Sequence, residues 1–184
     1  MRHKLPLISV LIILLMLLCA CGNGVSELDA DPLSSQLSLD TRPIPSEYVG
    51  LSMAELKDKS TTPIYRDVTI DIENYKGKLI WYEGKVDRLF KGSKPNTFQV
   101  WVHVTHVSEV AGTKVDKWRD PILLLYSLER GPELKADDSL QFVGTVLGLY
   151  VTSEQRLPGS GMTNKRYYPQ VNAIKVDLVD KLDK

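Results

Sequence analysis

Apolar and polar side chains alternate along residues 79–87, which is the period of a β-strand that buries one face. The side chains that share the buried face are those of Ile80, Tyr82, Gly84 and Val86. A glycine in the middle of a strand marks a sharp bend or a close approach of two backbones. The stretch therefore predicts a long strand that is strongly curved at Gly84.

Four further strands are expected from the same kind of pattern, at 98–105, 122–126, 140–146 and 171–179. The second and third are joined through Gly112, which predicts a hairpin tip, and Gly144 repeats the role of the first strand's glycine. A long polar loop is expected at 153–168. Five short strands with two glycine kinks predict a mainly β fold, a five-stranded Greek-key barrel of the OB type. One short N-terminal helix is expected to cover an end of this barrel.

The first twenty residues have the pattern of an export signal. Arg2 and Lys4 precede an apolar run at 5–18, which is too short to span a membrane comfortably. The run ends in Leu18-Cys19-Ala20-Cys21, which resembles the bacterial lipobox, with Cys21 as the lipidated residue. Cys19 fits less well because bulky Leu18 precedes it. The alternative is a plain secretory peptide with two incidental cysteines.

Lipidation would place diacylglycerol on the Cys21 thiol, and two or more acyl chains anchor a protein stably in a bilayer. The expected location is the cell membrane, on its extracytoplasmic face, or the outer membrane in a host that has one. Residues 22–46 hold no helical or strand period, so the predicted organisation is a signal peptide at 1–20, lipidated Cys21 with a flexible tether at 21–46, and an OB domain at 47–184.

Charge argues against nucleic acid as a partner. The chain has 23 basic and 23 acidic residues, and loss of Arg2 and Lys4 with the signal leaves 21 against 23. A slightly acidic domain lacks the basic footprint that a phosphate backbone requires. Cleavage also removes Cys19 and lipidation caps Cys21, so no thiol remains for a disulfide or a metal.

Three stretches of the domain resemble small exported prokaryotic lipoproteins that carry an OB-fold domain of the tRNA-anticodon-like type. The stretches are Tyr65-Arg66-Asp67, Glu73-Asn74-Tyr75-Lys76-Gly77-Lys78 and Tyr82-Glu83-Gly84-Lys85-Val86. A strand ending in Gly148-Leu149-Tyr150 and the last strand add to the resemblance. The resemblance implies an OB fold, and it supplies no catalytic residues or cofactor.

Motifs of enzymes and metal sites are not found in the sequence. No G-x-S-x-G elbow, phosphate-binding glycine loop or H-E-x-x-H occurs. His103 and His106 are three apart, so on a strand they point to opposite faces and cannot hold one ion. The prediction is therefore a non-catalytic protein with no metal site and no cofactor.

Aromatic residues provide the candidate binding site. If the inward faces are as described, Trp81 and Trp101 point outward on neighbouring strands, where OB folds bind oligomers by stacking. The remaining candidate ligand-binding residues are Lys85, His103, Tyr167 and Tyr168. The alternative is that the N-terminal segment folds over both indoles and buries them.

The sequence thus predicts a membrane-anchored binding module for an envelope protein or glycan. One alternative is a structural or assembly subunit of a cell-surface complex. A second is an oligonucleotide-binding OB domain, which the charge balance disfavours.

Overall fold

The computed structural model describes residues 40–110, 112–155 and 163–179. The chain divides into two compact units, Met1–Asp31 and Pro32–Lys184, and all of the described residues belong to the second. The lipobox and the lipidation residue Cys21 lie outside the described residues.

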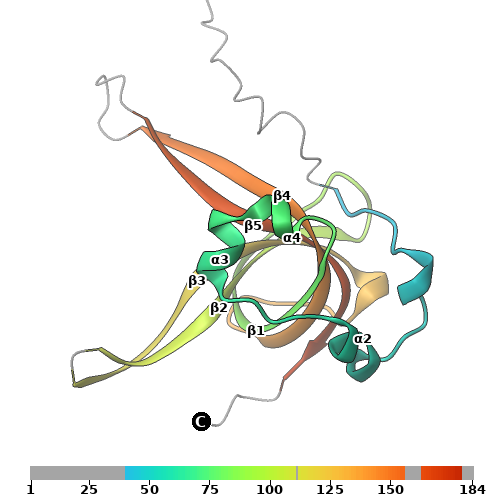
Figure 1. The fold of residues 1–184 in the computed structure, drawn as a ribbon, viewed down its shortest axis with the longest axis horizontal. Coiled ribbons are helices and arrows are strands. Elements are labelled where there is room, and N and C mark those ends of the chain that lie inside the picture. The colour runs from blue at the N-terminus through green and yellow to red at the C-terminus, as the bar shows by residue number, and fades with distance from the viewer. Residues whose placement is uncertain (1–39, 111, 156–162, 180–184) are drawn as a thin grey trace, which may run out of the picture. The chain divides into compact units, whose positions relative to one another are not determined.

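The described part of the chain is mainly β, with five strands as the sequence predicts, and it also contains a few short helices. The strands are β1 (Leu79–Lys91), β2 (Thr97–Val110), β3 (Thr113–Ser127), β4 (Ser139–Gln155) and β5 (Thr163–Leu178). They close into a ring in the order β1-β2-β3-β5-β4, and Figure 1 looks into that ring. All neighbours are antiparallel except β3 and β5, which run parallel over three residue pairs.

Alternating apolar side chains fill the interior of the ring. Ile80, Val100, Leu124, Phe142 and Val171, one from each strand, are inaccessible to solvent. They belong to a single cluster of buried side chains, so each strand contributes one face to the same core. This packing explains why apolar and polar side chains alternate most clearly in the strand segments that form the ring.

The two glycine kinks are points of close backbone approach, as predicted. A Cβ atom on Gly84 would lie 2.5 Å from Val102 Cγ1 and 2.7 Å from the carbonyl oxygen of His103. A Cβ atom on Gly144 would lie 2.6 Å from the carbonyl oxygen of Asn172. Neither position has room for a side chain, and this allows β1 to approach β2 and β4 to approach β5 closely enough for the ring to close.

Short helical segments precede and interrupt the series of strands. They are η1 (Ser46–Tyr48), α2 (Met53–Lys59), α3 (Tyr65–Ile70), α4 (Ile72–Tyr75) and η2 (Leu128–Arg130). The sequence predicted one helix over an end of the barrel, whereas α3 and α4 together pack Tyr65, Ile72 and Tyr75 against the core. The β-branched residues of this stretch explain why the helical segment is broken into short pieces.

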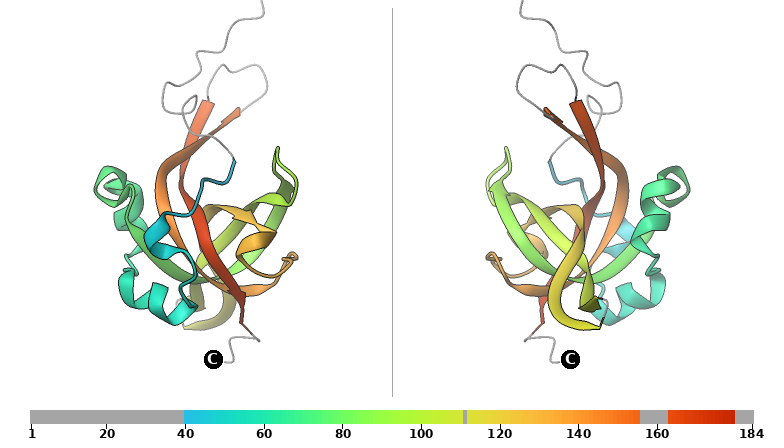
Figure 2. Two further views of the ribbon diagram at one scale, coloured as in Figure 1. Left: turned by 90° about the vertical axis from the view of Figure 1, so that its right-hand side faces the viewer. Right: turned by 90° about the vertical axis from the view of Figure 1, so that its left-hand side faces the viewer.

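Two hairpins extend beyond the ring, as Figures 1 and 2 show. Past the pair Thr105 and Arg119, β2 and β3 pair only with each other, and past Gly148 the same holds for β4 and β5. The predicted loop at 153–168 is therefore strand in its described part, pairing outward to Gln155 and Thr163. A hairpin outside the ring buries no face against the core, so its sequence lacks the alternation that would reveal it.

The last part of the predicted tether belongs to the folded unit. The Arg42 N–H donates a hydrogen bond to Asn172 Oδ1 at 2.8 Å, and the Asn172 amide donates to the Arg42 carbonyl at 3.3 Å. Arg130 Nη1 donates to the same Asn172 Oδ1 at 2.9 Å, and Arg130 also donates to the carbonyl oxygens of Ala173 and Arg42. Burial lowers the pKa of Arg130 from its ordinary value. The described tether residues are thus held against β5.

Candidate functional site

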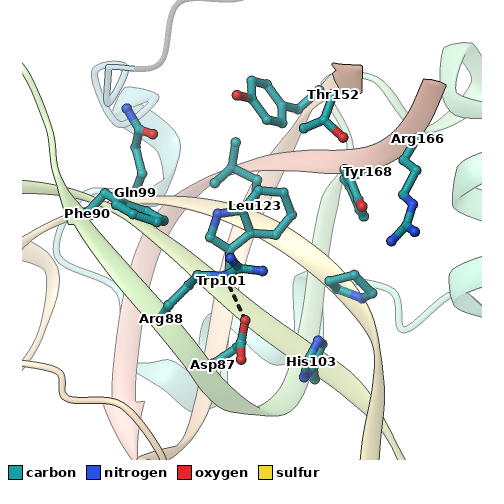
Figure 3. A pocket seen from close by; sticks show the side chains of 12 residues that line it. Asp87, Arg88, Phe90, Gln99, Trp101, His103, Leu123, Thr152, Arg166 and Tyr168 are labelled. Atoms are coloured by element: carbon teal, nitrogen blue, oxygen red, sulfur yellow. Dashed lines mark hydrogen bonds and ion pairs between the residues drawn. The ribbon is translucent and has the colours of Figure 1, made fainter. Parts of the chain in front are cut away.

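The outer face of β1, β2 and β3 forms the floor of a pocket with a volume of about 520 Å³. Cross-strand pairs share a face, so the strand register arranges the floor in rows. Arg88 pairs with Trp101, and Trp101 pairs with Leu123. In the next row, His103 pairs with Pro121. Trp101 therefore lies in the middle of the floor, as Figure 3 shows.

The hairpin of β4 and β5 provides the wall of the pocket. Tyr150 pairs with Tyr168, and Thr152 pairs with Arg166, so these four side chains share one face of the hairpin. All four line the pocket. The pocket is therefore a corner between the floor of the ring and one of its projecting hairpins.

The indole of Trp101 is in contact with aromatic rings of the wall and with a cation of the floor. Its centroid lies 4.8 Å from that of Tyr168 with an interplanar angle of 88°, and 6.0 Å from that of Tyr150 at 66°. The Arg88 guanidinium carbon lies 5.7 Å from the indole centroid. Both geometries are favourable, as edge-to-face and cation–π pairs. The indole is half-buried, so part of its surface faces the pocket.

Polar groups surround the aromatic corner. Arg88 Nε lies 2.9 Å from the Asp87 carboxylate, and both side chains line the pocket. Thr152 Oγ1 is buried and has no hydrogen-bond partner among the residues that the structure describes. Phe90, whose side chain is half exposed, and Gln99 close the pocket toward the β1–β2 turn. Aromatic surface with a few polar groups is the usual composition of a small-ligand site.

A partly buried hydroxyl holds the floor in place from the other side. The Tyr65 hydroxyl of α3 donates to the carbonyl oxygen of Pro121 at 3.1 Å. Burial raises the pKa of Tyr65, and the neighbouring Asp120 raises it further. The hydroxyl therefore remains a neutral donor at physiological pH.

Trp81 lies apart from this pocket, although it points outward as predicted. It packs with Met53 and Leu56 of α2, and Lys57 Nζ lies 4.1 Å from its ring centroid. Strand register explains the separation, since Arg88 lies opposite Trp101, whereas Trp81, seven residues earlier on β1, pairs with Val143 of β4. The two predicted indoles thus have different roles. Trp81 is partly buried against α2, as the alternative expects for both indoles, whereas the contacts of Trp101 within the described residues are with Arg88, Tyr150 and Tyr168.

The other predicted residues divide in the same way. His103 and Tyr168 line the pocket beside Trp101. Lys85 pairs with His103 in the register, but its ammonium lies 2.9 Å from Asp137 and does not line the pocket. Tyr167 points away from the pocket, because it precedes Tyr168 on β5 and alternate residues face opposite sides.

Sequence reasoning missed Arg88, Phe90, Tyr150 and Thr152 as pocket residues. Their outward positions follow from the register, but a bulge shifts the parity of β1 between Val86 and Arg88. Tyr150 stands in the sequence at the end of the Gly148-Leu149-Tyr150 strand, but its partner on β5, Tyr168, falls in the predicted loop at 153–168.

A metal site is not visible in the described part of the chain. No group of three or more His, Cys, Asp or Glu side chains is placed to hold an ion there. The pocket itself contains one carboxylate, that of Asp87, together with His103. Two such groups with an arginine beside them make a poor donor set for a divalent cation.

A shallower groove lies beside the docked N-terminal segment. It is lined by side chains of η1, α2 and β5, among them Tyr48, Leu51, Leu56, Ile174 and Lys175. Arg130, which lines the groove, already donates its hydrogen bonds within the fold. The aromatic lining of this groove is Tyr48, whereas Phe90, Trp101, Tyr150 and Tyr168 line the pocket around Trp101, which therefore offers more ring surface for recognition.

No protein-family model matches the chain, and a search of the curated proteins finds no match. Within the described ranges, no helix combines the length and apolar character needed to cross a membrane.

Proposed function

We propose that this chain is a lipoprotein, anchored through diacylglycerol on Cys21 to the extracytoplasmic face of the cell membrane, whose OB-type domain binds an envelope glycan without transforming it. The strand order β1-β2-β3-β5-β4 supports the OB assignment, because a Greek-key ring of five strands has this connectivity. The lipobox at Cys21 supports the anchor. Both agree with the resemblance to exported OB-fold lipoproteins.

The observation that carries the binding function is the aromatic corner of Trp101 and Tyr168 in an open pocket. Ring surface of this kind packs on the apolar faces of sugars and bases, and OB folds use the outer face of their early strands for oligosaccharides and oligonucleotides. Thr152, Gln99 and Arg88 add hydrogen-bonding groups around the rings. Rings with polar groups at their edge suit a saccharide, whose ring carries hydroxyls.

Pocket size favours a glycan over a protein partner. A volume of about 520 Å³ is that of a small-ligand site, whereas a stable protein interface buries roughly 800 Å² on each partner. A second candidate function, a structural subunit of a surface complex, is favoured by a different observation. Ile64 immediately precedes α3 and Ile70 is its last residue, and each has 71% of its surface exposed.

The test of glycan binding uses the full-length lipidated protein in detergent micelles and follows tryptophan emission. Addition of envelope oligosaccharides is expected to change the emission of the wild type and of Trp118→Phe. Trp101→Phe should lose the change, because the reporting indole lies in the pocket. Trp118 is a suitable control since it lies on the β2–β3 hairpin against His106. A signal that survives in Trp101→Phe and disappears in Trp118→Phe would overturn the proposal.

The anchor is tested separately, by labelled palmitate incorporation in a bacterial host. Cys21→Ala should abolish the label and release the protein from the membrane fraction. Cys19→Ala should keep both, because this cysteine leaves with the signal peptide. Label retained in Cys21→Ala would contradict lipidation at that residue.

A further inference from the structure

The charge around Trp101 differs from that of the whole domain. The pocket holds two guanidinium groups, those of Arg88 and Arg166, against the single carboxylate of Asp87. The chain outside its first twenty residues is slightly acidic, so this is a local excess of positive charge. A local excess in a cleft attracts an anion and orients it.

The positive charge continues along the projecting β2–β3 hairpin. Arg119 pairs with Thr105 and Lys117 pairs with Val107, so both continue the face that His103 occupies. Both basic side chains are exposed. The opposite face of the hairpin carries the ring contact between His106 and Trp118, so the two faces differ in character. A ligand longer than one ring would thus meet further cations beyond the pocket.

Arg166 and Thr152 stand side by side in the wall of the pocket. They are register partners on β5 and β4, and both line the site. A guanidinium with a neighbouring hydroxyl donates several hydrogen bonds to one oxyanion, and Thr152 Oγ1 has no partner within the described ranges. Figure 3 shows both side chains on the same side of Trp101, next to Tyr168.

We infer that the pocket binds an acidic saccharide, with a sugar ring against Trp101 and Tyr168 and its carboxylate at Arg166 and Thr152. The inference rests on the proposed glycan function and names its ligand class. A carboxylate, with one negative charge, suits a pocket whose floor already holds the Asp87 carboxylate beside Arg88. A nucleic acid would need a larger basic footprint than the near-neutral chain provides.

The first experiment compares charged and uncharged forms of one ligand on the full-length lipidated protein in detergent. The probes are tetragalacturonate and a hyaluronan tetrasaccharide, each beside its methyl ester, which keeps the ring and removes the charge. At least one acid should bind, and its ester should bind about ten- to a hundredfold more weakly, as expected for loss of a hydrogen-bonded charge. Titration calorimetry measures both forms.

Neighbouring residues on β5 provide matched controls. Arg166→Gln should weaken the acid about tenfold or more and leave the ester unchanged, whereas Lys165→Gln removes the same charge from the opposite face and should change neither. Arg166→Lys should recover part of the affinity. Tyr168→Leu should weaken acid and ester together, and Tyr167→Leu neither, because Tyr168 touches Trp101 and Tyr167 lies on the other face of β5.

The outcomes separate this inference from the function on which it rests. Equal affinity for acid and ester, or binding of a neutral oligosaccharide alone, overturns the inference and leaves glycan binding standing. Absence of binding by every saccharide overturns both. Preferential binding of an oligothymidylate or a glutamate-rich peptide at the same residues also overturns both, because the ligand would belong to another class.

Discussion

Tyr168 stands edge-on to Trp101, with ring centroids 4.8 Å apart and planes at 88°. The two residues come from strands that are not hydrogen-bonded neighbours in the ring, β5 and β2. Their contact therefore ties the projecting β4–β5 hairpin to the outer face of β2. The same contact forms the corner of the pocket.

Loss of this contact should reduce stability measurably. Tyr168→Leu keeps an apolar side chain but removes the edge-to-face pair, and we expect the free energy of unfolding to fall by about 0.5–1.5 kcal/mol. Tyr167→Leu, on the exposed face of the same strand, should change it by less than about 0.5 kcal/mol. Urea denaturation followed by circular dichroism measures both. Equal losses would mean that the ring pair adds nothing to packing.

The close approach at the two glycines predicts a larger effect. Gly84→Ala and Gly144→Ala each place a methyl group within 2.7 Å of a carbonyl oxygen on the neighbouring strand. We expect each to cost about 1–3 kcal/mol, because the backbone must move to accept the methyl group. Glu83→Ala, one residue away on the outer side of β1, should stay within about 0.5 kcal/mol. Thermal unfolding of the three variants decides whether the ring closes through these contacts.

The core of the fold could be predicted from the sequence because it follows from local patterns. The alternation of Ile80, Tyr82 and Val86 reflects one face packed inside the ring, and the kinks at Gly84 and Gly144 reflect close backbones. The projecting hairpins could not be predicted in the same way, since they bury no face against the core. Nor could the docking of Arg42, whose partner Asn172 lies 130 residues away in the chain.

The candidate site could be predicted only in part, for a related reason. The alternation of inward and outward side chains on β2 can be read from neighbouring residues alone, and it correctly brings Trp101 and His103 to one face. Which residue of β1 lies beside Trp101 depends on register, and the bulge between Val86 and Arg88 places Arg88 there instead of Asp87. Trp81 lies in a different row, because it pairs with Val143 of β4 and not with β2.

The buried hydroxyl of Tyr126 predicts a dependence of stability on alkaline pH. Burial raises the pKa of Tyr126 to about 12, while an unfolded tyrosine ionises near pH 10. Below pH 10 the hydroxyl is neutral in the folded and the unfolded chain, so its full contribution to the free energy of unfolding is present. Between pH 10 and 12 the unfolded chain loses the proton first, so the free energy of unfolding falls.

Tyr126→Phe isolates this contribution. At pH 7 the variant should be less stable by about 0.5–1.5 kcal/mol, because the hydrogen bond from the hydroxyl to the Pro132 carbonyl is lost. The difference from the wild type should shrink as pH rises from 10 toward 12, since only the wild type gains from ionising this group when it unfolds. Urea denaturation at pH 7, 10 and 11.5 measures the difference. A constant difference across these values would contradict the burial argument.

The hydrogen bonds of Arg130 and Arg42 predict that substitution of these two arginines lowers stability by different amounts. Arg130 uses its guanidinium to hold the Arg42 carbonyl, Asn172 and Ala173, whereas Arg42 contributes its backbone N–H and carbonyl. Arg130→Met should therefore lower the free energy of unfolding by about 1.5–3 kcal/mol, as expected for hydrogen bonds from a charged group. Arg42→Ala, with its side chain exposed, should cost less than about 0.5 kcal/mol.

Hydrogen exchange then shows whether the loss is local. In Arg130→Met the amides of residues 40–48 should exchange faster than in the wild type, because the segment loses its hold on β5, while those of β2 should change little. In Arg42→Ala the segment should keep its protection. Equal acceleration in both variants would mean that the Arg42 side chain holds the segment, contrary to the geometry. Since β5 carries both Asn172 and the pocket residue Tyr168, protection at Tyr168 in Arg130→Met also reports whether the pocket wall depends on the docked segment.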